Sequence, residues 1–130
     1  MKKILLLLFI STAVIACKKE NAPAASGLFG KWELTAVHGG LSPARAVDAG
    51  SGDLYEFDSD STFTRYQDNK IINKGRFSVR FDEERNGTKF GLIYFTGTTT
   101  YKDAFQIRPS SILVGSSAAD GPSYEYIKIK

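Results

Sequence analysis

The feature that most restricts the fold of this chain is the succession of short strand-like runs and turn residues from Phe29 to the last residue. Runs of β-branched and aromatic residues alternate with clusters of Gly, Asn, Asp, Pro and Ser. None of these runs follows the 3.6-residue period of an amphipathic helix. The pattern is typical of sandwiches and barrels built from hairpins. We therefore expect an all-β, antiparallel domain.

The strongest turn signal is the dipeptide Asn86-Gly87. A two-residue type I′ hairpin needs φ > 0 at both central positions, which Asn and Gly tolerate. Pairing outward from this turn gives three cross-strand pairs that share one face: Phe81 with Leu92, Val79 with Tyr94, and Phe77 with Thr96. In this register Ile93 and Phe95 fall on the polar face, so we expect a segment or a partner to cover them.

Other turn signals divide the rest of the domain. They are Asp58–Ser61, Asp68-Asn69, Pro109-Ser110 and Asp120–Pro122, and Gly75 predicts a bulge or bend inside its strand. The predicted strands are Lys31–Val37, Leu54–Phe57, Thr62–Gln67, Lys70–Phe81, the run after Gly87, Thr99–Ile107, Ser111–Gly115 and Tyr124–Lys130. About eight strands can close into a barrel with a small interior. We therefore predict an antiparallel up-and-down barrel.

The segment Gly39–Gly52 interrupts the strand pattern. Ser42 is able to cap a short helix that has Pro43 at its first position. Loops of this length in compact domains are often lids or binding loops. A disordered connection between two strands is an equally good interpretation.

Residues 1–16 have the features of an export signal. Lys2 and Lys3 precede the apolar stretch Ile4–Ala16, whose 13 residues are too few to span a bilayer. The end of this stretch together with the next residue, Val14–Cys17, resembles the bacterial lipobox. This resemblance implies diacylation of Cys17, cleavage before it and N-acylation. Several acyl chains would anchor the protein stably. The alternative is a secreted protein whose signal happens to end near the only cysteine.

The resemblance implies a lipid-anchored protein of the bacterial cell envelope, with residues 17–27 as a flexible tether. Lys18 stands where an Asp would resemble an inner-membrane retention signal, which favours the outer membrane. The tether also resembles that of Bacteroidota lipoproteins, some of which reach the cell surface. The tether lacks the acidic cluster of those proteins, so a periplasmic location and a cell-surface location both fit the sequence.

The charge balance argues against nucleic acid as a partner. The sequence has a formal net charge of +3, but Lys2 and Lys3 belong to the signal, which leaves about +1. Basic and acidic residues alternate along the predicted strands and form no basic stripe.

Residues 28–130 resemble the lipocalin-like domains of small Bacteroidota lipoproteins. Gly30-Lys31-Trp32 matches the Gly-x-Trp signature of lipocalins, Phe57 to Tyr66 match an aromatic hairpin, and Tyr124-Glu125-Tyr126 match a Tyr-rich final strand. The Thr-Asp-Tyr motif of vertebrate lipocalins is absent. The resemblance implies a barrel closed by Gly30 and Trp32, with Arg108 stacked on Trp32. It does not imply a ligand.

Catalysis has little support in the sequence. The only histidine, His38, would need Ser42 and either Asp48 or Asp53 to form a nucleophile relay. No Gly-x-Ser-x-Gly elbow is present, and a single His at a strand end is usually a surface residue. We therefore expect a protein that is not an enzyme.

Metal and cofactor sites are also poorly supported. Asp58-x-Asp60-x-Thr62 begins like a calcium loop, but Phe63 occupies the Gly position and Asn69 the Glu position of an EF-hand. A solvated turn is the better interpretation. No Cys/His pair has zinc-ligand spacing and no phosphate loop is present, so we expect no cofactor.

Aromatic residues are the remaining signal, with nine Phe, six Tyr and one Trp. Core packing explains most of them, but an inward Tyr hydroxyl needs a partner that a water or a ligand can supply. The ligand-pocket candidates are Tyr66, Phe77, Val79, Phe81, Leu92, Tyr94, Tyr101, Tyr124 and Tyr126.

Two functions fit this sequence. The first is a membrane-anchored barrel that binds a small apolar ligand, with Gly39–Gly52 near its mouth. The second is a filled barrel that docks an envelope protein through an exposed apolar patch at Ile93 and Phe95.

Overall fold

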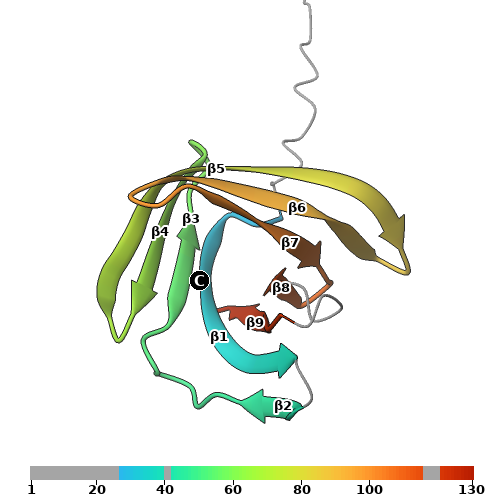
Figure 1. The fold of residues 1–130 in the computed structure, drawn as a ribbon, viewed down its shortest axis with the longest axis horizontal. Helices are drawn as coiled ribbons and strands as arrows, with labels where there is room; N and C mark the ends of the chain where they lie inside the picture. Colours follow the sequence, from blue (N-terminus) through green and yellow to red (C-terminus); the bar gives the residue numbers. More distant parts are fainter. Residues whose placement is uncertain (1–26, 40–41, 116–120) are drawn as a thin grey trace, which may run out of the picture.

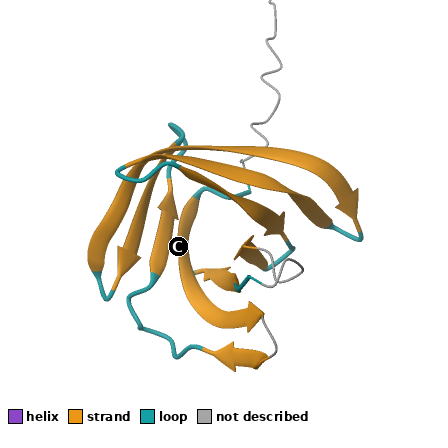
Figure 2. Cartoon of the chain, viewed as in Figure 1, coloured by secondary structure: helices purple, strands orange, loops and turns teal. Residues whose placement is uncertain are grey.

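The computed structural model describes residues 27–39, 42–115 and 121–130, and every regular element in these ranges is a strand (Figure 2). The strands are β1 (Gly30–Gly39), β2 (Ser42–Ala46), β3 (Leu54–Phe57), β4 (Thr62–Gln67), β5 (Lys70–Arg85), β6 (Thr88–Gly97), β7 (Tyr101–Ile107), β8 (Ser111–Gly115) and β9 (Ser123–Lys128). The predicted signal at residues 1–16, Cys17 and all but the last residue of the predicted tether lie outside the described residues.

Eight of the strands form a closed antiparallel barrel (Figure 1). Each strand from β3 to β9 pairs with the next, β3 pairs with β1, and the β1–β9 pairing closes the ring. The predicted all-β up-and-down barrel of about eight strands is confirmed, and it is consistent with a lipocalin-like barrel. Within the described ranges, no helix is long and apolar enough to cross a membrane.

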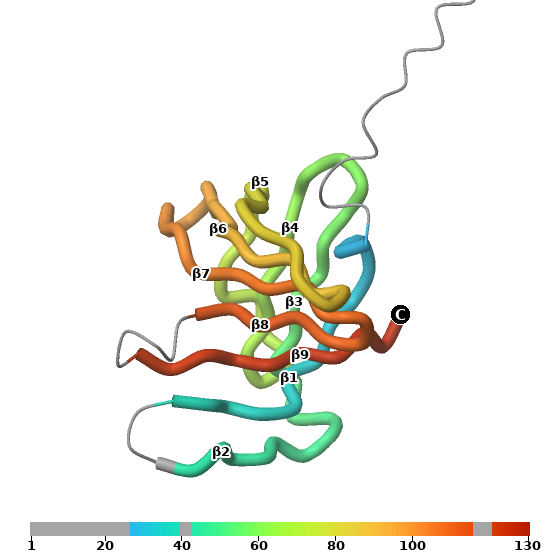
Figure 3. Tube along the Cα trace, turned by 90° about the vertical axis from the view of Figure 1, so that its right-hand side faces the viewer, coloured from blue at the N-terminus to red at the C-terminus, as the bar shows by residue number. Residues whose placement is uncertain are grey.

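The ninth strand, β2, corrects the expectation for Gly39–Gly52. The first half of β1 pairs with β3, and its second half, from Ala36 to Gly39, pairs with β2. β1 extends past the end of β3 and would otherwise expose unpaired N–H and C=O groups. A strand satisfies those groups and a helix would not, so the helix predicted at Ser42-Pro43 is wrong. Figure 3 shows β2 beside β1, on the side away from β9.

The predicted turns at Asn86-Gly87 and Asp68-Asn69 form where the sequence placed them. Asn86 and Gly87 have φ of 54° and 78°, as a type I′ turn requires. Asp68 and Asn69 also have positive φ, at 51° and 62°, between β4 and β5. These residue types tolerate left-handed backbone, so the local sequence predicts the position of both turns.

The register of the β5–β6 hairpin differs from the prediction beyond its first pairs. Glu84 pairs with Lys89 as expected, but a bulge at Asp82 shifts the register. Beyond it the core-face pairs are Phe81 with Gly91, Val79 with Ile93 and Phe77 with Phe95. A one-residue shift moves every side chain of one strand to the opposite face.

The shift overturns two expectations. Ile93 and Phe95 are fully buried in the core, so the predicted exposed patch at these residues does not exist. Leu92 and Tyr94 pair with Arg80 and Ser78 on the outer face, so their predicted place beside the inward aromatic residues is wrong.

Gly75 is not a bulge, because the β4–β5 register is continuous through it and shifts only near Tyr66. A Cβ at Gly75 would collide with the Thr96 carbonyl oxygen of β6. The glycine therefore permits close approach of two strand backbones.

Aromatic rings fill one end of the barrel. The Phe57 and Phe77 rings meet edge to face at 4.9 Å, and the Phe63 and Phe95 rings at 4.7 Å. Trp32 is buried nearby, and its Nε1–H donates to the Leu28 carbonyl oxygen at 2.7 Å. This end, which we call the aromatic end, is closely packed hydrocarbon.

Gly30 and Trp32 lie on β1, which pairs with both β3 and β9. Trp32 on β1 pairs with Tyr55 of β3 and Lys128 of β9. A Cβ at Gly30 would collide with the Lys130 carbonyl oxygen, so glycine allows the end of the chain to pack against the start of β1.

Candidate functional site

The inner face of the barrel is polar at the end away from Phe57 and Phe77. On β4, Phe63 and Arg65 are two positions apart, so both face the interior of the barrel. Arg65 pairs with the inward Tyr55 of β3. On β7, Tyr101 and Asp103 pair with the buried Phe95 and Ile93, so they share the inner face. We call this the polar end.

Tyrosine side chains surround the Arg65 guanidinium. Its central carbon lies 5.2 Å from the centroid of the Tyr55 ring, a cation–π distance. The Tyr55 hydroxyl lies 3.0 Å from the Tyr101 hydroxyl, and the Tyr126 ring meets the Tyr55 ring edge to face at 5.2 Å. These contacts hold Arg65 against aromatic surface inside the barrel.

The charge states at the polar end follow from burial. Burial raises the pKa of the Tyr55 and Tyr126 hydroxyls well above their usual range, so both stay protonated at physiological pH. Burial alone lowers the pKa of Arg65, but interactions with the surrounding tyrosines outweigh it and the pKa is raised. Arg65 therefore stays cationic. Burial also raises the pKa of Asp103, against smaller opposing effects of the Ala104 N–H and Arg65.

A cavity of about 240 Å³ opens beside Arg65. At roughly 30 Å³ per water molecule, it has room for about eight waters. Its described lining residues come from β1, β2, β4 and β9 and from the end of the β2–β3 connection: Leu34, Val37, Arg45, Asp53, Arg65, Tyr66, Gln67, Tyr124 and Tyr126. Because β2 contributes Arg45, part of Gly39–Gly52 lies at the cavity, as the ligand-binding hypothesis predicts.

The structure brings together only part of the predicted pocket. Tyr66, Tyr124 and Tyr126 line the cavity. Tyr101 is not among the lining residues, but its hydroxyl contacts that of Tyr55, which packs against Arg65. The remaining candidates lie elsewhere: Phe77 in the aromatic end, Val79 and Phe81 against the core along β5, and Leu92 and Tyr94 on the outer face.

Sequence reasoning missed Arg45 and Arg65, and it named Asp53 only as a partner of His38 in the hypothetical relay. The sequence does contain a signal for Arg65. In a strand, residues two positions apart point to the same face, so Arg65 lies on the same face as Phe63. No local pattern indicates Arg45, since its position depends on the pairing of β2 with β1.

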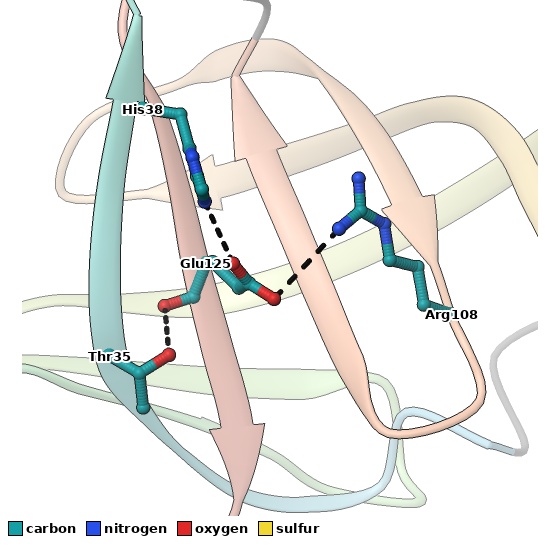
Figure 4. Close-up of polar contacts among 4 residues, drawn as sticks. All are labelled: Thr35, His38, Arg108 and Glu125. Carbon is teal, nitrogen blue, oxygen red and sulfur yellow. Dashed lines mark hydrogen bonds and ion pairs between the residues drawn. The ribbon is translucent and has the colours of Figure 1, made fainter. Parts of the chain in front are cut away.

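A second polar cluster lies on the outer face of the β1–β9 seam (Figure 4). His38 Nε2 lies 2.7 Å from Glu125 Oε2, Arg108 Nη1 lies 3.9 Å from Glu125 Oε1, and the Thr35 hydroxyl donates to the Glu125 carbonyl oxygen at 3.2 Å. The hydrogen bond from His38 is the main cause that lowers the pKa of Glu125, with smaller contributions from Ser111 and Arg108. The cluster joins the two strands that close the barrel.

This cluster corrects two expectations. The His38 side chain pairs with Glu125, and not with Asp48 or Asp53, so the hypothetical relay does not form. The cation over the Trp32 ring is Lys128, whose Nζ lies 5.6 Å from the ring centroid. The predicted stacking of Arg108 on Trp32 is therefore wrong.

Residues 27–39, 42–115 and 121–130 contain no group of three or more His, Cys, Asp or Glu side chains that could hold a metal ion. In the predicted turn at Asp58–Thr62, the Asp60 carboxylate accepts hydrogen bonds from the Thr62 N–H and hydroxyl.

Comparisons with protein-family models, curated proteins and solved structures gave no match. The function is therefore inferred from the geometry of the barrel.

Proposed function

We propose that this protein is a lipid-anchored binding protein of the bacterial cell envelope, with a lipocalin-like barrel that takes a small molecule into its polar end. The observation that carries the proposal is the 240 Å³ cavity, which reaches inward-facing Arg65 beside a packed aromatic end. A barrel with a purely structural role fills its interior with apolar side chains. A cavity with a few convergent polar groups is typical of a ligand site.

The walls of the cavity indicate the character of the ligand. Leu34, Val37 and the rings of Tyr124 and Tyr126 provide apolar surface, while Arg65 and the tyrosine hydroxyls provide polar contacts. The small apolar ligand expected from the sequence thus becomes an amphipathic one. The alternative, docking of an envelope protein, loses its original support because Ile93 and Phe95 are in the core.

The location in the envelope is supported by the sequence. The Lys2-Lys3 start, the short apolar stretch and the lipobox-like Val14–Cys17 favour lipidation of Cys17. Lys18 favours the outer membrane. The anchor would keep the barrel at a membrane surface and concentrate it near membrane-derived molecules.

Native mass spectrometry tests the binding function. The mature chain from residue 17, with Cys17→Ser to prevent acylation, would be incubated with envelope extract and purified. We expect a discrete added mass that survives purification. A Val37→Phe variant, which narrows the cavity, should lose the added mass, while Tyr94→Phe on the outer face should retain it. A clean apo mass for the unsubstituted barrel would contradict the proposal.

A further inference from the structure

The inward position of Arg65 is unusual because arginine side chains are mostly exposed, and this one lies partly buried on the inner face of the barrel. The Arg65 guanidinium packs against the Tyr55 ring and near the Tyr101 and Tyr126 hydroxyls. Neutral hydroxyl groups solvate a charge less well than water does, so a desolvated cation here favours an anion.

The protein does not supply that anion from the described part of the chain. No carboxylate there lies within 4.0 Å of the Arg65 guanidinium. Asp53 lines the cavity and Asp103 lies on the inner face of β7, but both have other contacts. Asp103 Oδ1 accepts the Ala104 N–H at 3.1 Å, and Asp53 Oδ1 accepts the Asp68 N–H at 3.4 Å. Arg65 therefore lines the cavity without an ion-pair partner among the described residues.

A second guanidinium reinforces the positive charge. Arg45 on β2 lines the same cavity at its exposed side, so the described lining has two cations and one carboxylate, Asp53. A planar guanidinium binds a carboxylate through two parallel hydrogen bonds, a geometry that a lysine cannot offer. The cavity thus combines a bidentate anion-binding group with apolar walls.

From this arrangement we propose that the ligand is a small amphipathic carboxylate, whose head group pairs with Arg65 and whose apolar part lies against Leu34, Val37 and the tyrosine rings. The inference rests on the proposed binding function and specifies its ligand class. The 240 Å³ volume restricts the bound part to a short chain or a single ring.

Calorimetric titration with a matched pair of probes, octanoate and 1-octanol, tests the ligand class. The two probes have the same apolar chain and differ in the charge of the head group. We expect the mature Cys17→Ser chain to bind octanoate at least tenfold more tightly than octanol. Arg65→Met, which keeps the length of the side chain, should weaken octanoate binding at least tenfold and leave octanol binding unchanged.

Arg80→Met is the matched control, because Arg80 is an exposed arginine on the outer face of β5. It should change the affinity for neither probe. If Arg65→Met does not fold, the comparison of octanoate with octanol on the unsubstituted barrel still decides the question. Arg45→Gln, at an exposed position, should then weaken octanoate binding severalfold.

The outcomes separate the ligand class from the binding function. Equal affinities for the two probes, or no octanoate binding at all, would overturn the carboxylate inference. If envelope extract still gave an added mass in those cases, the binding function would stand with a ligand of another class. A clean apo mass together with no probe binding would contradict both.

Discussion

Arg65 is the residue on which the functional account depends, because it places a positive charge on the inner face of a largely aromatic barrel. Its immediate partners are rings and hydroxyls, and within the described residues no ion pair compensates it. A charge placed in this way lowers stability, as is common at functional sites. Sequence analysis selected tyrosines and passed over Arg65, since arginine is usually exposed and only the surrounding strands show that it is enclosed.

Substitution of Arg65 should therefore separate stability from binding. Arg65→Met replaces an uncompensated, half-buried cation with an apolar side chain of similar length. We expect the free energy of unfolding to stay within about 1 kcal/mol of the wild-type value or to rise, because apolar replacement of buried charges is often neutral or stabilising. Urea denaturation followed by circular dichroism measures this. A loss of about 3 kcal/mol or more would show that Arg65 has a structural partner.

Glu125 is the charged residue whose role is structural, and its effect on stability should depend on pH. Its pKa is lowered in the folded barrel, chiefly by the hydrogen bond from His38. The stabilisation is therefore complete above the unfolded-state pKa of about 4.3 and is lost as the pH falls through the lower folded-state pKa. Glu125→Gln should cost about 1 kcal/mol at pH 7.

The difference between the wild-type chain and Glu125→Gln should narrow steadily when urea denaturation is repeated below about pH 4. Arg108→Gln, which removes the longer 3.9 Å contact, is the matched control and should cost less. A difference that stays constant down to low pH would show that the ionised carboxylate contributes nothing.

At the scale of elements, the β5–β6 hairpin shows what sequence can and cannot predict. Asn86-Gly87 fixes the turn because only a few residue types accept positive φ, and the first pairs follow from it. The bulge at Asp82 has no such local signal, because the sequence Phe81–Glu84 is equally compatible with an uninterrupted strand. The one indication was that Ile93 and Phe95 fell on the polar face. The bulge places both residues in the core. Two large apolar residues on a polar face were therefore the sign that the predicted register was wrong.

The bulged register can be tested by two substitutions at neighbouring positions. Phe95→Ala removes a fully buried ring that contacts Phe63 and Tyr101 at 4.7 and 4.8 Å, and should cost about 3 to 5 kcal/mol. Tyr94→Ala, on the outer face, should cost less than about 1 kcal/mol. Chemical denaturation of both variants measures the difference. A larger loss of unfolding free energy for Tyr94→Ala than for Phe95→Ala would contradict the bulged register.

At the scale of the whole molecule, the barrel combines a packed aromatic end with a polar end. The repeated turn signals make the fold class and the approximate strand number predictable, because antiparallel neighbours follow one another along the chain. The site is less predictable, because it joins strands that are distant in sequence. β1 contacts both β2 and β9, and the cavity needs side chains from all three as well as from β4. Tyr66, Tyr124 and Tyr126 were expected there, and the charged residues were not.

An NMR titration of the mature Cys17→Ser chain with octanoate tests most directly whether the polar end binds a small amphipathic carboxylate. We expect saturable chemical-shift changes at the Arg65 side-chain Nε–H and at backbone amides of β1, β4 and β9 around the cavity. The outer face of the β5–β6 hairpin, including Tyr94, should show no change. Absence of changes at the cavity, or changes confined to the outer face, would contradict carboxylate binding at the polar end.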